Sequence, residues 1–240
     1  MKTILKMSAL PALLCAFVSV AHADSVNLNS AGSTSGPYTN GTLQYLGSSP
    51  LSGGSPLIAP TGPTVAGGAS SYDVAADGVW VNAIAGTSWV SNSPEAGPDG
   101  SVTDPNAFYY YSTTFSAIGG TSIYDGSINI MADDTAEVLL NGVVIVPFGV
   151  IGGDGHCSDN VPNCNTVDTV SLNGTTLLAG SNTLTVIDAQ TGSGPAGVDF
   201  SASLTETPEP SSLLLLGTGL LGLAIVVFRK ANPSNVVLNS

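Results

Sequence analysis

The chain has one apolar run near each end. In the long stretch between the two runs, apolar and polar positions alternate. The first run occupies residues 9–20, and the second, Leu213–Phe228, holds sixteen residues without a charge, Asn, Gln or Pro. Between the runs, short alternating segments are separated by clusters of Gly, Pro, Asn and Asp. Because a strand presents its side chains to opposite faces in turn, this pattern predicts a β domain between two hydrophobic terminal segments.

The alternating segments predict roughly eight or nine short strands, arranged as an antiparallel jelly-roll β-sandwich. Asn141-Gly142 lies between two of them and suits the positive φ angles of a type I′ hairpin turn. Residues 24–71 are rich in Gly, Ser and Pro, so there we expect only an edge strand or an extended loop. The sandwich itself is therefore predicted at residues 72–205. The expected strands are Val79–Val81, Ser88–Val90, Ala107–Phe115, Ser127–Met131, Ala136–Leu140, Val143–Val146, Val167–Leu172, Thr183–Asp188 and Val198–Thr205.

Residues 1–23 have the three parts of a secretory signal peptide. Two lysines supply the charged first part, residues 9–20 supply the apolar part, and Ala21-His22-Ala23 is an A-x-A cleavage site. We therefore expect passage through the Sec translocon and cleavage by a signal peptidase before Asp24.

The second apolar run predicts a transmembrane helix at residues 211–228. These eighteen residues would form a helix about 27 Å long, close to the roughly 30 Å of a bilayer's hydrocarbon core. Residues 206–210 form a linker before the helix, and residues 229–240 form a basic stop and a polar tail after it. By the positive-inside rule the basic pair stays in the cytoplasm and the middle of the chain is exported.

The end of the chain resembles a known sorting signal. Pro208-Glu209-Pro210, an apolar helix with small residues and the basic pair Arg229-Lys230 are similar to the PEP-CTERM tail of Gram-negative bacteria. The resemblance implies that an exosortase recognises the tripeptide. It also implies a transient stay in the inner membrane and release to the cell surface or extracellular matrix. The polar tail runs on to Ser240, further past the basic pair than in many members of that family.

Three stretches in the middle of the chain resemble the galactose-binding-like jelly rolls that are appended to many glycoside hydrolases. Tyr111–Phe115 is similar to their YxxxF strand, Ala132–Gly142 to their hairpin and Ala179–Val186 to their GxNxLxV strand, in the same order. The resemblance implies the fold rather than a ligand, because related sandwiches bind many different glycans or none.

The part of the chain expected to be exported has a strongly negative net charge. All seventeen Asp and Glu residues lie between Asp24 and Glu209, a stretch without Lys or Arg. Because binding to phosphates requires cationic side chains, this composition excludes nucleic acid as a partner. Cations, neutral sugars and basic proteins stay open as partners.

Cys157 and Cys164 are the two cysteines that remain after removal of the signal peptide. In an oxidising compartment they predict a disulfide, which for a loop of this size contributes about 2.5 kcal/mol. The alternative is a metal site that joins these cysteines with Asp154, His156 and Asp159. That spacing matches no ordinary zinc pattern.

The acidic residues offer a second candidate metal site. Asp133, Asp134 and Asp154 carry the oxygen ligands that calcium takes, so they are the candidate calcium ligands. Paired carboxylates could also serve glycoside hydrolysis, but acids in solvated turns explain the same residues. His156, the one histidine left after signal cleavage, lies near no nucleophile motif. We therefore predict no catalytic residue.

Trp80 and Trp89 are the candidate carbohydrate-binding residues, because indole rings can stack on sugars. The alternative is that both tryptophans belong to the core of the sandwich.

Together these features predict a non-enzymatic protein of the cell surface or exopolysaccharide matrix, with a structural or adhesive role. A carbohydrate-binding module that recognises exopolysaccharide, aided by calcium, is the second hypothesis. A glycoside hydrolase is the third.

Overall fold

The computed structural model describes residues 23–30, 43–51, 56–68, 70–117, 121–151, 157–207 and 210–231. The chain divides into two compact units. One is Asp24–Thr207, and the other consists of Met1–Ala23 with Pro208–Ser240.

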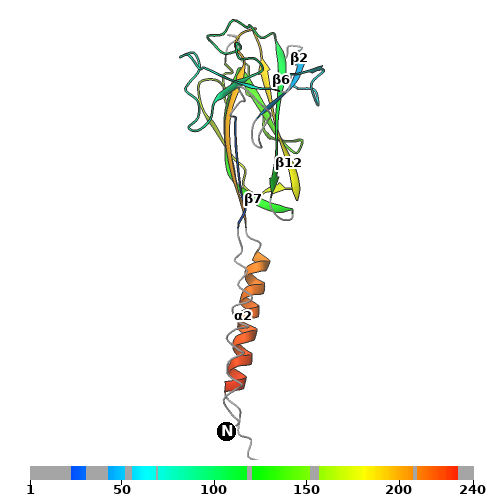
Figure 1. The fold of residues 1–240 in the computed structure, drawn as a ribbon, viewed down its shortest axis with the longest axis vertical. Coiled ribbons are helices and arrows are strands. Elements are labelled where there is room, and N and C mark those ends of the chain that lie inside the picture. Colours follow the sequence, from blue (N-terminus) through cyan, green and yellow to red (C-terminus); the bar gives the residue numbers. More distant parts are fainter. Residues whose placement is uncertain are drawn as a thin grey trace, which may run out of the picture. The chain divides into compact units, whose positions relative to one another are not determined.

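The unit Asp24–Thr207 is a sandwich of two antiparallel sheets (Figure 1), which confirms the predicted all-β class. The first sheet has the order β10-β7-β13-β5-β4, with β1 paired to β13 and β11 paired to β7. Its strands are β1 (Ser25–Asn29), β4 (Tyr72–Val74), β5 (Trp89–Ser91), β7 (Ser122–Asp133), β10 (Asp168–Ser171), β11 (Thr175–Leu177) and β13 (Gly197–Glu206). The second sheet has the order β3-β2-β6-β12-β8-β9. Its strands are β2 (Gln44–Pro50), β3 (Val65–Ala66), β6 (Ala107–Ala117), β8 (Thr135–Leu140), β9 (Val143–Val146) and β12 (Gly180–Gln190).

Two long strand pairs form the centre of the sandwich. In the second sheet, β6 and β12 are paired along their whole length, from Ala107 opposite Gln190 to Ala117 opposite Gly180. In the first sheet, β7 and β13 are paired from Asp133 opposite Gly197 to Tyr124 opposite Glu206. Each pair joins segments far apart in the sequence, so these pairings fix the fold.

The core lies between the two sheets and is built from alternate residues of each strand. On the second sheet the inward residues include Tyr109 and Tyr111 of β6 and Val186 of β12, and on the first they include Ile130 of β7 and Phe200 of β13. Each such side chain, fully buried, stabilises the fold by about 1.5–3 kcal/mol. The period-two pattern of the sequence is therefore the direct source of the sandwich.

The hairpin predicted at Asn141-Gly142 is confirmed. β8 and β9 pair across this turn, and both turn residues have positive φ angles, 51° for Asn141 and 80° for Gly142. Glycine adopts that conformation without steric cost, and asparagine tolerates it better than most residues.

Two expectations about the first half of the sandwich were wrong. Val79–Val81 is not a strand, because the amides of Val79 and Trp80 bond to the carbonyl of Ala76 (3.0 and 3.1 Å) and close a turn. The boundary predicted at residue 72 is not found either. β1 and β2 belong to the two sheets, and β2 lies between β3 and β6 rather than at an edge.

The second unit contains helix α2, Pro210–Ala231, which confirms a helix where the second apolar run predicts one. In the part of the chain that the structure describes, no helix is both long and apolar enough to cross a membrane. The prediction of a transmembrane helix at residues 211–228 is therefore not supported. Residues 1–22 of the predicted signal peptide lie outside the described residues.

The end of β1 is held by a buried carboxylate of β13. Asp199 is fully buried and accepts hydrogen bonds from the Ser30 hydroxyl (2.8 Å), the Thr87 hydroxyl (2.5 Å) and the Ile84 amide (2.7 Å). Burial raises the pKa of this carboxyl, and the bonds from Thr87, Ile84 and Ser30 oppose that rise. One side chain thus joins the N-terminal strand, the loop at residues 84–87 and β13.

Replacing Asp199 with alanine should lower the free energy of unfolding by about 3 kcal/mol, because it leaves buried donors without an acceptor. Chemical denaturation of the full chain in detergent measures this. The control is Asp99→Ala on an exposed loop, which should change stability by less than about 0.5 kcal/mol. Equal losses in the two variants would contradict a role for Asp199 as an anchor.

Candidate functional site

The two candidate carbohydrate-binding tryptophans are core residues. Trp80 and Trp89 expose only 3% and 1% of their surface, and their rings stack on each other with centroids 4.4 Å apart. The Trp89 indole donates to the carbonyl of Val81 (2.9 Å). The assignment of these residues to sugar binding was therefore wrong, because neither ring has a face open to a ligand.

Asp133, a predicted calcium ligand, is held by the first of these tryptophans. The Trp80 indole donates to Asp133 Oδ2 at 2.6 Å. Burial, together with the negative charge of neighbouring Asp134, raises the pKa of Asp133 to about 8. Without a bound cation, the folded protein therefore favours the protonated form of this carboxyl at neutral pH.

Asp134 and Asp154 complete the predicted calcium set. Asp134 Oδ2 accepts from both the amide and the hydroxyl of Thr191, each at 2.6 Å, so it holds the start of the turn after β12. Asp154 lies outside the described residues, as does His156. The structure therefore brings Asp133 and Asp134 together without testing the predicted three-ligand site.

The predicted disulfide between Cys157 and Cys164 is present, with the two Cα atoms 5.5 Å apart. Its sulfur atoms and an oxygen of Asp133 lie within 4.8 Å of one another. Metal ligation by cysteine uses the thiolate, which a disulfide removes. In this oxidised form the grouping is therefore a disulfide within one loop, close to the end of β7, rather than a metal site.

A face of small polar side chains lies on part of the outer side of the first sheet. Residues that alternate with the buried ones on β1, β13, β7 and β10 meet in two rows across the strands. Strand pairing aligns Asn29, Ser201, Asn129 and Thr169 in one row and Asn27, Ser203, Ser127 and Ser171 in the other. We call these eight residues the polar face. Neighbouring strands lie about 4.8 Å apart, so the rows form a regular array of hydroxyl and amide groups.

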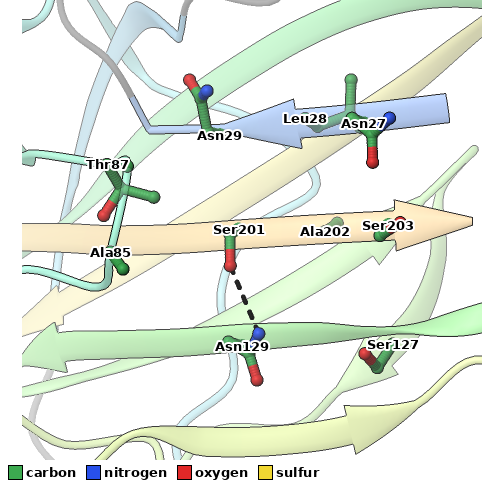
Figure 2. Close-up of a pocket in the computed structure, with 11 residues that line it drawn as sticks. Asn27, Leu28, Asn29, Ala85, Thr87, Ser127, Asn129, Ser201, Ala202 and Ser203 are labelled. Atoms are coloured by element: carbon green, nitrogen blue, oxygen red, sulfur yellow. Dashed lines mark hydrogen bonds between the residues drawn. The ribbon is translucent and has the colours of Figure 1, made fainter.

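The polar face contains a shallow hollow of about 230 Å³. β1, β13 and β7 form its floor, and Ala85 and Thr87 of the loop at residues 84–87 lie at one end of it (Figure 2). Within it, Asn129 Nδ2 donates to the Ser201 hydroxyl at 3.3 Å, the contact dashed in Figure 2. The Thr169 hydroxyl in turn donates to Asn129 Oδ1 at 2.7 Å.

The chemistry of the polar face is neutral. Hydroxyl groups both donate and accept hydrogen bonds, and each Asn amide offers two donors and a carbonyl acceptor. None of the eight residues carries a charge or an aromatic ring. The arrangement therefore suits an uncharged, hydroxyl-rich ligand, bound by hydrogen bonds rather than by stacking.

The sequence already contained the signal for this face. Asn and Ser alternate with apolar residues in Val26–Ser30, Ser127–Ile130 and Ser201–Leu204, so each strand has a polar outer side. What the sequence does not show is that β1 lies beside β13, which makes the separate stripes a single surface.

Comparison with known proteins finds a known sorting motif near the end of the chain. Residues 206–230 match the PEP-CTERM protein-sorting motif. The match includes Pro208, Glu209, Pro210, Arg229 and Lys230, all predicted sorting residues. Pro208, Glu209 and the side chain of Arg229 lie outside the described part of the structure. The PEP-CTERM motif implies export, processing by an exosortase and sorting to the cell surface.

No curated protein sequence matches the chain. Among solved structures, a Podospora anserina GH26-CBM35 β-(1,4)-mannanase shares 21% identity at a TM-score of 0.33, over 58% of this chain and 28% of that one. A cycloalternan-forming enzyme from Listeria monocytogenes also shares 21% identity, at a TM-score of 0.28 and over 53% of this chain and 10% of that one. A family 35 carbohydrate binding module from Clostridium thermocellum shares 17% identity at a TM-score of 0.28, over 56% of this chain and 98% of that one. At these TM-scores the likenesses carry no conclusion about ligand or activity.

The raised pKa of Asp133 predicts an unusual dependence of stability on pH. Asp133 titrates near 8 in the folded state and near its ordinary value of 3.8 in the unfolded chain. Between these values the folded state binds more protons, so the stability contributed by protonation is complete below about pH 4 and is lost as the pH rises through about 8. Burial, followed by the charges of Asp133 and Asp134, also raises the pKa of Asp188, so Asp188 adds to the same trend.

Denaturation of the full chain in a chelator should therefore give a free energy of unfolding that falls as the pH is raised from about 5 to about 8. Asp133→Asn should flatten this slope, while Asp99→Asn should leave it unchanged. A wild-type stability that rises over this range would contradict the assignment.

Proposed function

We propose that this chain is a non-catalytic protein of the cell surface or matrix whose β-sandwich binds neutral polysaccharide on the polar face. The single observation that carries the proposal is the polar face itself, with its two cross-strand rows of hydroxyl and amide groups. Retention in a matrix by such binding gives the protein a structural or adhesive role.

The charge of the domain favours a neutral glycan over an anionic one. The polar face carries no charge, and the stretch from Asp24 to Glu209 contains seventeen acids and no Lys or Arg. An acidic polysaccharide would meet a repulsive field without a cationic side chain to bind it. Uncharged sugars meet no such penalty.

The small size of the hollow predicts weak binding of a glycan at each site. It is smaller than the roughly 300–1,000 Å³ of ordinary small-molecule pockets, so it suits a short stretch of a chain that lies across the sheet. Four hydrogen bonds at about 1 kcal/mol each give about 4 kcal/mol, or a Kd of about 1 mM per site. Retention in a matrix would then depend on many copies binding many repeats.

The sorting step is tested by changing the tripeptide. In cells that contain an exosortase, replacing Pro208, Glu209 and Pro210 with alanine should abolish C-terminal processing, because the motif is no longer recognised. Intact mass of the protein from the envelope and the culture medium reports this. Pro233→Ala, a change of the same kind outside the matched residues 206–230, is the control. Equal processing of both variants would contradict the sorting role.

Glycan binding is tested by removing hydroxyl groups from the polar face. Ser201→Val with Ser203→Val should weaken retention on neutral polysaccharide gels of mannan, glucan and galactan at least fivefold, since valine suits a strand but forms no hydrogen bond. The matched control is Thr114→Val with Ser116→Val, two exposed residues at the same spacing on β6 of the other sheet. Retention that is equal for wild type and both double variants, or absent from the wild type on every gel, would contradict the proposal.

A further inference from the structure

One end of the sandwich interior holds a group of oxygen atoms that lack partners. In the described part of the chain, five buried side-chain atoms have no hydrogen bond, and all five belong to Asp104, Tyr111, Asp188 and Gln190. They are both carboxylate oxygens of Asp188, Oδ2 of Asp104, Oε1 of Gln190 and the hydroxyl of Tyr111. We call these four residues the interior oxygen cluster.

Strand pairing brings these residues together. The inward positions of β12 are Leu184 and Val186, and continuing the same alternation places Asp188 and Gln190 on the inward side as well. Asp188 lies opposite Tyr109 of β6, and Tyr111 is the next inward residue of that strand.

Asp104 joins the cluster from the loop before β6. Its backbone forms a bridge with Gly194, in the turn that follows β12. Its Oδ1 accepts from the Asn92 amide at 3.0 Å, which leaves Oδ2 without a partner. Burial comes first among the causes that raise the pKa of Tyr111, followed by the charges of Asp188 and Asp104, so both carboxylates lie within electrostatic reach of that hydroxyl.

An isolated charge at this depth would be strongly unfavourable. Asp188 is completely buried, and neither of its oxygens has a hydrogen bond of good geometry; the neighbouring Ala189 amide is the smallest influence on its pKa, which burial raises. Burying an ionised carboxylate without a partner costs several kcal/mol. The stretch from Asp24 to Glu209 has no Lys or Arg that could offset it. The neutralising charge must come from a bound proton or from a metal ion.

The set of atoms favours a metal ion over a proton. A proton on Asp188 supplies one donor, which can satisfy one acceptor, whereas a cation can bind several carboxylate and amide oxygens at once. Two carboxylates, an amide carbonyl and a phenol are hard oxygen ligands of the kind that calcium takes, six to eight at a time with water completing the shell. Asp133 and Asp134, whose charges also reach Asp188, add negative potential that attracts a cation.

We propose that the interior oxygen cluster binds one divalent cation of the calcium class, with Asp188 and Asp104 as the charged ligands and Gln190 Oε1 as a neutral one. The Tyr111 hydroxyl is a weaker neutral ligand or a donor to a metal-bound water. This site differs from the set predicted from the sequence, because Asp133 and Asp134 are bonded to Trp80 and Thr191. It is also separate from the polar face, since it lies inside the sandwich.

The test uses the full chain in detergent, stripped with a chelator and then returned to chelator-free buffer. Calorimetric titration with calcium chloride should give one ion per chain, and added calcium should raise the melting temperature by several degrees because it binds only the folded state. Asp188→Asn should weaken calcium binding at least tenfold and abolish the shift in melting temperature. Tyr111→Phe, which removes one unpartnered oxygen and keeps the ring, should weaken binding a few-fold.

Asp99→Asn is the matched control, since it removes one negative charge from an exposed loop and should bind calcium like the wild type. Two results would overturn the proposal. One is a stripped wild type that takes up no calcium and does not change its melting temperature. The other is a calcium response that survives Asp188→Asn intact. If protons alone neutralise the cluster, the first result appears, together with an Asp188→Asn variant at least as stable as the wild type.

Discussion

The absence of Lys and Arg between Asp24 and Glu209 limits how this fold can compensate the charges of its buried acids. Asp199 has three donors from Ser30, Ile84 and Thr87, and Asp133 has an indole donor from Trp80. These contacts replace the ion pairs that a more ordinary composition would allow, and each is worth about 0.5–1.5 kcal/mol, or about 1.5–3 kcal/mol where the carboxyl is ionised. Among the described residues, Asp188 has no hydrogen bond of comparable geometry, so an ionised Asp188 would be left without a compensating donor.

The same composition shapes the surface. Where most proteins cover a sheet with a mixture of charges, this chain places two rows of Asn, Ser and Thr across the outer side of β1, β13, β7 and β10. An uncharged face on a strongly acidic domain repels anions less than the rest of the surface does and offers many hydrogen-bonding groups. The lack of Lys and Arg therefore bears on both the polar face and the interior oxygen cluster. It makes the polar face suited to neutral ligands and the interior oxygen cluster suited to a cation.

Local patterns predicted much of the fold, and pairing between distant segments decided the rest. Alternation indicated β6 and β13, and Asn141-Gly142 indicated the hairpin, because these signals depend on neighbours in the sequence. β1 was missed since its short polar sequence becomes a strand only beside β13. Trp80 was misassigned because a turn, rather than a strand, carries its ring into the core. The sequence indicated Asp133, Asp134 and Asp154 as calcium ligands because these acids lie in turns and loops that local patterns reveal. The unpartnered oxygens of Asp188 and Gln190 become visible only when β12 is paired with β6.

Export and cation binding fit together in energetic terms. Binding modules in extracellular settings hold calcium with Kd values of about 0.1–1 mM, which matches compartments where calcium is plentiful and fails where it is scarce. For a chain that carries the PEP-CTERM motif, a site of this strength would be empty before export and filled after it. Filling the site adds stability only to the folded state, by about 1.4 kcal/mol when calcium is at ten times its Kd. The sandwich would then be less stable before export than at the surface, where we propose that the polar face binds its ligand.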